Sequence, residues 1–433
     1  MRQILKKKYL KVQFKITSPL SIGSGENEKT DKDIIRNSLG IPYIPASAIA
    51  GVVRERLDKK KAEKYLGNIV INRNPGSGEN KESAIESRVL FYDANICEEQ
   101  EERVSIRDNV ALDEYKTAKN GAKFDMEVIE PGIRFETFFE QSFFSKEEED
   151  ITLFIAEAFS LGLEFGTKTT RGYGNVVAES AWEACFNLEN ISETDKWLDF
   201  DVKKDSGWSL LPMKNAEAPK IGKIVLKLKQ NGAISIRRYT TSIHAKNETV
   251  PDMEQLTVRE IGGEEKPVIP GTTWAGAIRR RMMEFGIAVD GGNSLFGAAG
   301  GNRDAKREKS RICFSESQIM GAESKVISRN AIDRFTGGTV DGALFTEKTW
   351  YGGTTELVIS LRGDKKMTEE EKTALAATLA DLHFGFLAVG GETSIGRGLF
   401  KITEINGELI EEAEDAKRVF SCLEHTIGEV FSA

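Results

Sequence analysis

The first half of the chain alternates between the hydrophobic periods of strands and of helices. Residues 11–18 alternate apolar and polar side chains, the period-two pattern of a strand with one buried face. Helical patterns follow at 46–62 and 146–161, with strands at 88–93 and 175–181. This half therefore predicts the order strand, helix, strands, helix and strand.

The second half repeats the same order. A strand pattern at 223–228 precedes helical patterns at 272–285 and 369–387, and a final strand begins at Leu399. The tail at 409–431 is predicted to be a helix packed on this half. Two βαββαβ halves predict an α+β fold of two tandem ferredoxin-like (RRM-like) domains with hairpin and loop insertions.

Short motifs recur at a nearly constant offset between the halves. Ile44–Gly51 recurs as Ile269–Gly276, 225 positions later, and Gly166–Gly174 recurs as Gly390–Gly398, 224 positions later. A third pair, in which Ala111–Asp113 matches a segment ending at Asp333, has an offset of 220. Repeats of domain size predict a tandem duplication. The expected boundaries are a first domain at 1–190, a polar linker at 191–219 and a second domain at 220–433.

Charge and composition limit the classes of function. The net charge is −8, which weighs against general coating of nucleic acid but leaves room for a local basic groove. No apolar run is long enough to span a bilayer, and the N-terminus leads into a strand, not a signal-peptide segment. The four cysteines are far apart in sequence, which favours free thiols in a reducing cytoplasm.

Two duplicated features carry candidate chemistry. Each helix start has a proline followed by a small hydroxyl residue, Ser47 or Thr272, suited to capping the helix or to holding an anion there. Each glycine-rich loop can aim N–H groups at an anion, although an ordinary αβ turn has the same composition. Neither loop is a Walker or a dinucleotide-binding motif, so nucleotide binding is disfavoured.

These motifs resemble those of the RAMP superfamily of CRISPR-associated proteins, in particular two Cas7 (Csm3-like) units fused in tandem. The resemblance covers nearly the whole chain. The matching segments are Leu20–Gly25, Ile34–Asn37, Ile41–Gly51, Gly166–Gly174, Val268–Gly271, Leu295–Gly297, Ile332–Gly338, Ala343–Phe345 and Gly390–Gly398.

The resemblance implies an RRM-like fold that binds CRISPR RNA in a type III effector complex, with target RNA and other Cas proteins as further partners. It also implies a hairpin "thumb" in each half, at about 111–128 and 332–346. From the helix starts and the loops, the expected RNA-binding residues are Ser47, Arg54, Lys168, Arg171, Gly172, Thr272, Arg279, Ser394, Arg397 and Gly398.

The resemblance further implies that such a subunit can cut target RNA with a loop aspartate, helped by Mg²⁺ or another divalent cation. By register this residue is Asp31, with Asp33 left open as the alternative. In the second half, counting back from Val258 lands on Glu254, and the nearest aspartate is Asp252. Asp31 and Asp252 are therefore the expected catalytic residues.

Two functions of other classes stay open. His244 and the glycine-rich loops would fit a Cas6-like endoribonuclease that processes CRISPR RNA. The acidic net charge would fit a purely structural assembly subunit that cuts nothing.

Overall fold

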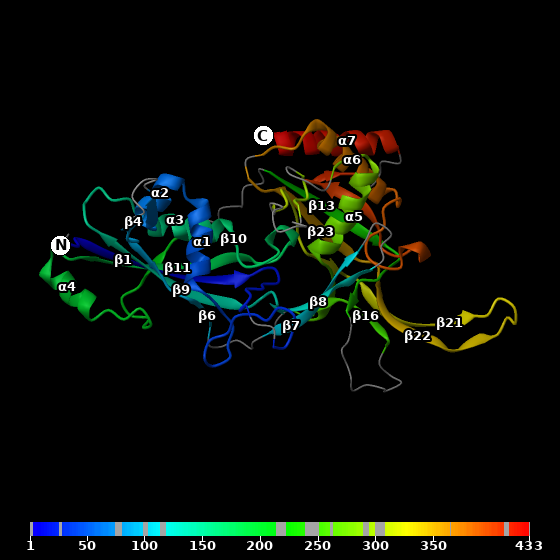
Figure 1. The fold of residues 1–433 in the computed structure, drawn as a ribbon, viewed down its shortest axis with the longest axis horizontal. Coiled ribbons are helices and arrows are strands. Elements are labelled where there is room, and N and C mark those ends of the chain that lie inside the picture. The colour runs from blue at the N-terminus through cyan, green and yellow to red at the C-terminus, as the bar shows by residue number, and fades with distance from the viewer. Residues whose placement is uncertain are drawn as a thin grey trace. The chain divides into compact units, whose positions relative to one another are not determined.

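The chain divides into two compact units, each with its own sheet, helices and core (Figure 1). Unit 1 comprises residues 1–106, 126–167 and 174–219, and unit 2 comprises 107–125, 168–173 and 220–433. Helices and largely antiparallel sheets in both units confirm the predicted α+β class. The computed structural model describes residues 3–25, 28–73, 80–97, 103–112, 118–213, 222–238, 251–259, 263–288, 294–298, 308–363, 365–410 and 415–432.

The sheet of unit 1 is built around β1 (Lys6–Ile16). This strand lies antiparallel between β9 (Arg134–Phe143) and β11 (Asn175–Asn187). Helices α1 (Ala46–Arg56) and α3 (Ile151–Leu161) contribute to the same buried cluster as β1. The remaining elements are β2 (Tyr43–Ile44), α2 (Lys59–Tyr65), β3 (Asn68–Arg73), β4 (Asn80–Ile85), β5 (Val89–Phe91), β6 (Ala94–Ile96), β10 (Leu163–Glu164), α4 (Ile191–Leu198) and β12 (Ser209–Leu211).

The segment predicted as a linker contains regular structure in its first part. Helix α4 covers residues 191–198, and β12 pairs with β11 at the edge of the unit 1 sheet. Trp197 and Trp208 pack here against a small aromatic cluster that includes Tyr9, and the indole of Trp197 donates to the Tyr9 hydroxyl at 2.9 Å. Burial of these aromatic side chains therefore holds in place a segment whose sequence is otherwise polar.

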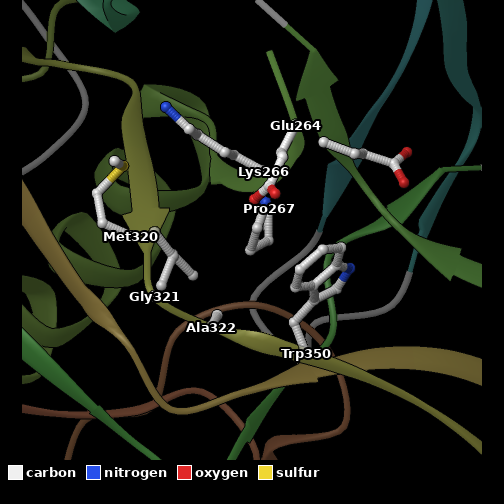
Figure 2. A pocket seen from close by; sticks show the side chains of 9 residues that line it. Glu264, Lys266, Pro267, Met320, Gly321, Ala322 and Trp350 are labelled. Carbon is white, nitrogen blue, oxygen red and sulfur yellow. The ribbon is translucent and has the colours of Figure 1, made fainter.

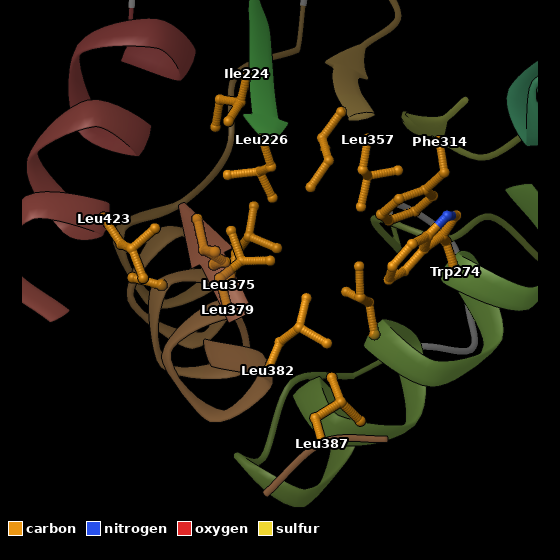
Figure 3. Packing of buried hydrophobic residues seen from close by; sticks show 14 of the residues in the cluster. Ile224, Leu226, Trp274, Phe314, Leu357, Leu375, Leu379, Leu382, Leu387 and Leu423 are labelled. Carbon is orange, nitrogen blue, oxygen red and sulfur yellow. The ribbon is translucent and has the colours of Figure 1, made fainter. Parts of the chain in front are cut away.

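Unit 2 has the same strand order around β13 (Lys223–Asn231). This strand lies antiparallel between β23 (Thr354–Leu361) and β24 (Leu399–Ile405). Figure 3 shows leucines of α6 (Glu369–His383) and Trp274 of α5 (Gly271–Glu284) pointing into the same core. The other elements are β14 (Ala233–Ile234), β15 (Arg237–Arg238), β16 (Met253–Gln255), β17 (Thr257–Arg259), β18 (Glu265–Ile269), β19 (Ile312–Phe314), β20 (Ser317–Met320), β25 (Glu408–Leu409) and α7 (Ala416–Ser432).

Helix α7 confirms the predicted C-terminal helix. It packs on α6, and Leu423 joins the buried cluster of unit 2 (Figure 3). Helix α6 begins with a capping box, because Thr368 and Glu371 exchange side-chain-to-backbone hydrogen bonds.

The corresponding helix of the first half has no such capping box. Helix α3 begins at Ile151, five residues after the predicted start at 146, and Asp150 is its N-cap. Glu148 cannot complete a box because its carboxylate pairs with Arg88 and accepts from the N–H of Phe144. Tertiary partners therefore override the local motif.

Both halves carry the expected hairpin. Strands β7 (Val104–Leu112) and β8 (Ala118–Ile129) form a two-stranded sheet, and residues 107–125 group with unit 2. Strands β21 (Glu323–Ile332) and β22 (Thr339–Tyr351) form a longer hairpin that extends away from the unit 2 sheet (Figure 1). Its tip exposes apolar side chains, including Phe335, which is 99% exposed.

Candidate functional site

The acidic segment of unit 1 contains two aspartates in different environments. Asp33 is buried, and its Oδ2 accepts from the N–H groups of Glu28 (2.7 Å) and Lys29 (3.0 Å). Its Oδ1 accepts from the N–H and the hydroxyl of Thr30, each at 2.8 Å. Burial opposes the charged form, but these hydrogen bonds outweigh it and lower the pKa of Asp33 to about 2. Asp33 therefore shapes the loop, whereas Asp31 is exposed to solvent.

The hydrogen-bond register aligns Ile35 of the first repeat with Leu256 of the second. The N–H of Ile35 donates to the carbonyl of Ile22 at 2.8 Å, and the N–H of Leu256 donates to the carbonyl of Ile236 at 2.7 Å. The adjacent residue pairs give the same alignment: Arg36 with Pro42, and Thr257 with Pro267.

This alignment makes Asp252 the counterpart of Asp31, since each lies four residues before its aligned position. The sequence-based count started from Val258 and reached Glu254, so it is wrong by two residues. Strand pairing, which the sequence does not show, sets the register. Asp252 is exposed, and its Oδ2 accepts from the N–H (2.7 Å) and the hydroxyl (2.9 Å) of Thr346. These bonds lower the pKa of Asp252.

A buried glutamate lies beside each acidic segment, and sequence analysis missed both. Glu127 of β8 accepts from the N–H of Ile34 (3.1 Å) and from Arg36 (3.0 Å). Glu347 of β22 lies 220 positions later, is also buried, and is paired with Met253 of β16. The repeat found in the hairpins has the same offset, so extending it along the second strand would have revealed this pair.

The two glycine-rich loops have the same backbone conformation, which supports the duplication. Lys168 and Glu392 are both left-handed, with φ of 57° and 54°. Each precedes a short 3-10 turn, η1 (Thr169–Arg171) or η2 (Thr393–Ile395), that ends at Gly172 or Gly396 with φ of 78° and 82°.

The side chains of the first loop turn toward other parts of unit 2. Lys168 donates to Asn109 of β7 and lies 4.7 Å from the ring centroid of Phe124. Arg171 is half-buried, and burial lowers its pKa, with the nearby charge of Arg279 acting in the same direction.

The second loop belongs to a buried ion-pair cluster. Arg397 is only 4% exposed and pairs with Glu347 and with Glu392 (2.9 Å). Arg329 contacts the same two carboxylates at 3.2 and 3.3 Å, and Arg237 contacts Glu392 at 3.2 Å. Burial and the charge of Glu392 raise the pKa of Glu347, against the opposing effect of nearby arginines. Arg397 therefore neutralises the buried carboxylate of Glu347 and the half-buried carboxylate of Glu392, whereas the sequence predicts that it binds RNA.

Ser47 and Thr272 do not cap their helices, so that expectation is corrected. Each is the second helical residue, and the N-caps are Pro45 and Pro270, with no side-chain cap. In unit 1 the first N–H of α1 donates to the carboxylate of Asp93 at 2.7 Å. The protein's own anion therefore lies at this helix start.

The remaining predicted residues have varied surroundings. Arg54 donates to the carbonyls of Leu66 (2.7 Å) and Gly67 (3.0 Å) after the end of α2. Ser394 is exposed, whereas a Cβ on Gly398 would lie 1.9 Å from the backbone oxygen of Val389. His244 lies outside the described residues.

A buried ion pair in unit 2 was not anticipated. Arg107 of β7 is 3% exposed, and its guanidinium pairs with the carboxylate of Glu316 through both terminal nitrogens, the longer contact being 3.3 Å. The same guanidinium lies 5.8 Å from the ring centroid of Tyr173. No sequence pattern connects residues so far apart in the chain.

Within the described residues, no three His, Cys, Asp or Glu side chains are close enough to hold a metal ion. A single exposed carboxylate such as Asp31 or Asp252 still suits Mg²⁺, which usually binds through one or two carboxylates together with water and substrate phosphates. No helix in the described part of the chain is long and apolar enough to cross a membrane.

Comparisons with known proteins identify the family. The sequence profile of the RAMP superfamily matches residues 13–177 and 241–401, about three quarters of the chain. Curated proteins gave no match. Among solved structures, a chain of the type III-B Cmr-beta complex bound to cognate target RNA aligns at 17% identity and a TM-score of 0.32. That alignment covers 41% of this chain and 61% of the other, so it spans less than two thirds of the related chain.

A chain from the apo state of the type III-B Cmr-beta complex aligns at 14% identity with a TM-score of 0.30, covering 41% of this chain and 98% of the other. The family assignment rests on the two matched regions, which correspond to the two repeats found in the sequence. The chain belongs to the RAMP superfamily and contains two RAMP regions.

Proposed function

We propose that this protein is a CRISPR RNA-binding backbone subunit of a type III RNA-guided effector complex. Its partners are then CRISPR RNA, target RNA and other Cas proteins, and each repeat is a Cas7-like, ferredoxin-like domain. The observation that carries the proposal is the duplicated acidic segment: Asp31 and Asp252 occupy the same register and are both exposed.

We further propose that both aspartates cut target RNA. RNA is cleaved by its own 2′-OH when the scissile phosphate is held in line and a nearby group accepts the proton. Asp31 suits this role better than Asp33, because the side chain of Asp31 is exposed to solvent whereas that of Asp33 is buried. A divalent cation held by the same carboxylate and by RNA phosphates would stabilise the developing charge.

The test is cleavage of labelled target RNA by the complex assembled with guide RNA. Asp31→Ala and Asp252→Ala should each remove one set of cuts while guide and target binding stay intact, and the double variant should cut nothing. Glu254→Ala is the matched control for Asp252→Ala, because it lies two residues away and should leave cutting unchanged.

Other outcomes point to the alternative functions. Full cutting by a variant lacking Asp31, Asp33, Asp252 and Glu254 would remove the nuclease assignment and leave a structural subunit. Metal-free cutting of repeat RNA by the isolated chain would instead support a Cas6-like processing enzyme. The RNA-binding roles expected for the loop and helix-start residues stay predictions.

A further inference from the structure

A cavity of about 380 Å³ in unit 2 lies beside Trp350 near the root of the β21–β22 hairpin (Figure 2). Its volume is at the lower end of the roughly 300–1,000 Å³ range of ligand sites, which suits one ring system better than a large cofactor. The lining comprises residues 264–267, residues 319–322 and Trp350.

The walls combine a flat aromatic face with polar groups. Trp350 packs partly against the unit 2 core, and in Figure 2 its indole lies near Pro267, with Met320 beyond. Met320 is 48% exposed, so the cavity has an apolar side that solvent reaches. Glu264 and Lys266 add charged groups that can accept and donate hydrogen bonds. This combination fits a planar, polar-edged ring.

Trp350, which lines the cavity, and Thr346, which contacts Asp252, lie on the same face of β22. Thr346, Lys348 and Trp350 alternate with the buried residues Glu347 and Thr349 along β22. A strand rises roughly 3.3 Å per residue, so Thr346 and Trp350 are about 13 Å apart.

Two acidic residues contact the same face of β22. Asp252 accepts from the hydroxyl of Thr346 at 2.9 Å, and Glu265, which lines the cavity, lies 3.5 Å from the ammonium group of Lys348. An extended RNA strand that runs along β22 would therefore meet both the cavity and the carboxylate of Asp252.

We propose that the cavity beside Trp350 holds one unstacked base of single-stranded RNA and thereby fixes which phosphodiester lies near Asp252. Stacking on an aromatic ring accepts any base, because every base has a π face. This inference rests on the proposed RNA-binding function and adds to it a site for one nucleobase.

The test follows tryptophan fluorescence of the full chain during titration with a short single-stranded RNA. The RNA should quench the tryptophan emission of the wild type and of Trp208→Phe, a matched control in unit 1. Trp350→Phe should lack the part of the emission that RNA quenches in the wild type. An RNA of the same length without bases should quench neither protein. Trp350→Leu, which retains an apolar side chain, should bind the normal RNA at least about fivefold more weakly and the baseless RNA equally well.

The outcomes separate this site from the general function. Equal quenching in Trp350→Phe, or an equal loss of affinity for normal and baseless RNA in a folded Trp350→Leu, would overturn the base site while leaving RNA binding in place. Absence of binding to any RNA by the wild type would overturn the base site and the proposed function together.

Discussion

At the scale of single residues, neighbours of the same type have different roles because their hydrogen-bond partners differ. Asp33 accepts three backbone N–H groups and one hydroxyl, whereas Asp31, two residues earlier, is exposed. The roles of Glu347 and Arg397 are likewise set by their partners, since the fold buries both charged residues against opposite charges. Residue type alone therefore indicates which interactions a side chain can make, but not which of them it makes in the fold.

Asp33→Asn should destabilise unit 1 at neutral pH by about 1–3 kcal/mol, because an amide accepts fewer of these hydrogen bonds. Since the pKa of Asp33 is lowered from 3.8 to about 2, its stabilising effect is complete above about pH 4 and is lost as the pH falls toward 2. The difference in melting temperature between wild type and variant should therefore shrink over that range.

Asp31→Asn provides the control for this measurement. Its side chain is exposed, so the substitution should change the melting temperature little at any pH. A difference between Asp33→Asn and wild type that stays constant down to pH 2 would contradict the assigned role of Asp33.

The sequence indicated candidate residues for the site, but it did not predict their surroundings. Asp31 and Asp252 were chosen from sequence, and the structure places them at equivalent positions. The burial of Arg397 could not be predicted, because its partner Glu347 lies 50 residues away on a hairpin strand. Partners that distant are brought together only by the fold.

At the scale of elements, the two glycine-rich loops share a conformation but differ in their surroundings. A Cβ on Gly172 would lie 2.3 Å from the backbone nitrogen of Glu316, whereas a Cβ on Gly396 would meet no described atom within 4 Å. The loops were predictable because glycine spacing reports backbone shape. The close approach at Gly172 was not, since it depends on the strand ends that pack against the loop.

Gly172→Ala should therefore cost more stability than Gly396→Ala. Both substitutions force a side chain into the left-handed region, at a cost of roughly 1–2 kcal/mol. Only Gly172→Ala adds a clash with backbone, which typically costs about 1–3 kcal/mol more. Urea unfolding of the two variants measures the difference, and equal destabilisation would show that the close approach does not exist in solution.

At the scale of the whole molecule, the division into compact units does not follow the sequence repeats. Residues 107–125 and 168–173 come from the first repeat but group with unit 2. The expected boundary near residue 190 was placed at the start of a polar segment, because polar segments often connect domains. Polarity does not indicate which segments pack against residues that are distant in sequence.

Arg107→Leu should destabilise unit 2 by roughly 3–5 kcal/mol, because the carboxylate of Glu316, 5% exposed as a side chain, would lose its partner. The double variant Arg107→Leu with Glu316→Leu should recover part of that loss, since no buried charge remains. Urea unfolding followed by fluorescence tests both expectations.

The exposed ion pair of Arg134 with Glu179 serves as the comparison. Arg134→Ala should cost less than about 1 kcal/mol, as surface pairs usually do. A similar small effect for Arg107→Leu would mean that the Arg107–Glu316 pair is open to water.

The grouping of residues 107–125 with unit 2 also affects the order in which contacts form during synthesis. Arg107 and Glu316 are separated by 209 residues, and ribosomes add about 5–20 residues per second, so Arg107 precedes its partner by roughly 10–40 s. During that interval the nascent hairpin carries an arginine without its carboxylate, together with the apolar Ile106 and Val110, which stay about half exposed even in the finished fold. We therefore expect the first repeat to emerge from the ribosome incomplete and to need shielding until the second repeat follows.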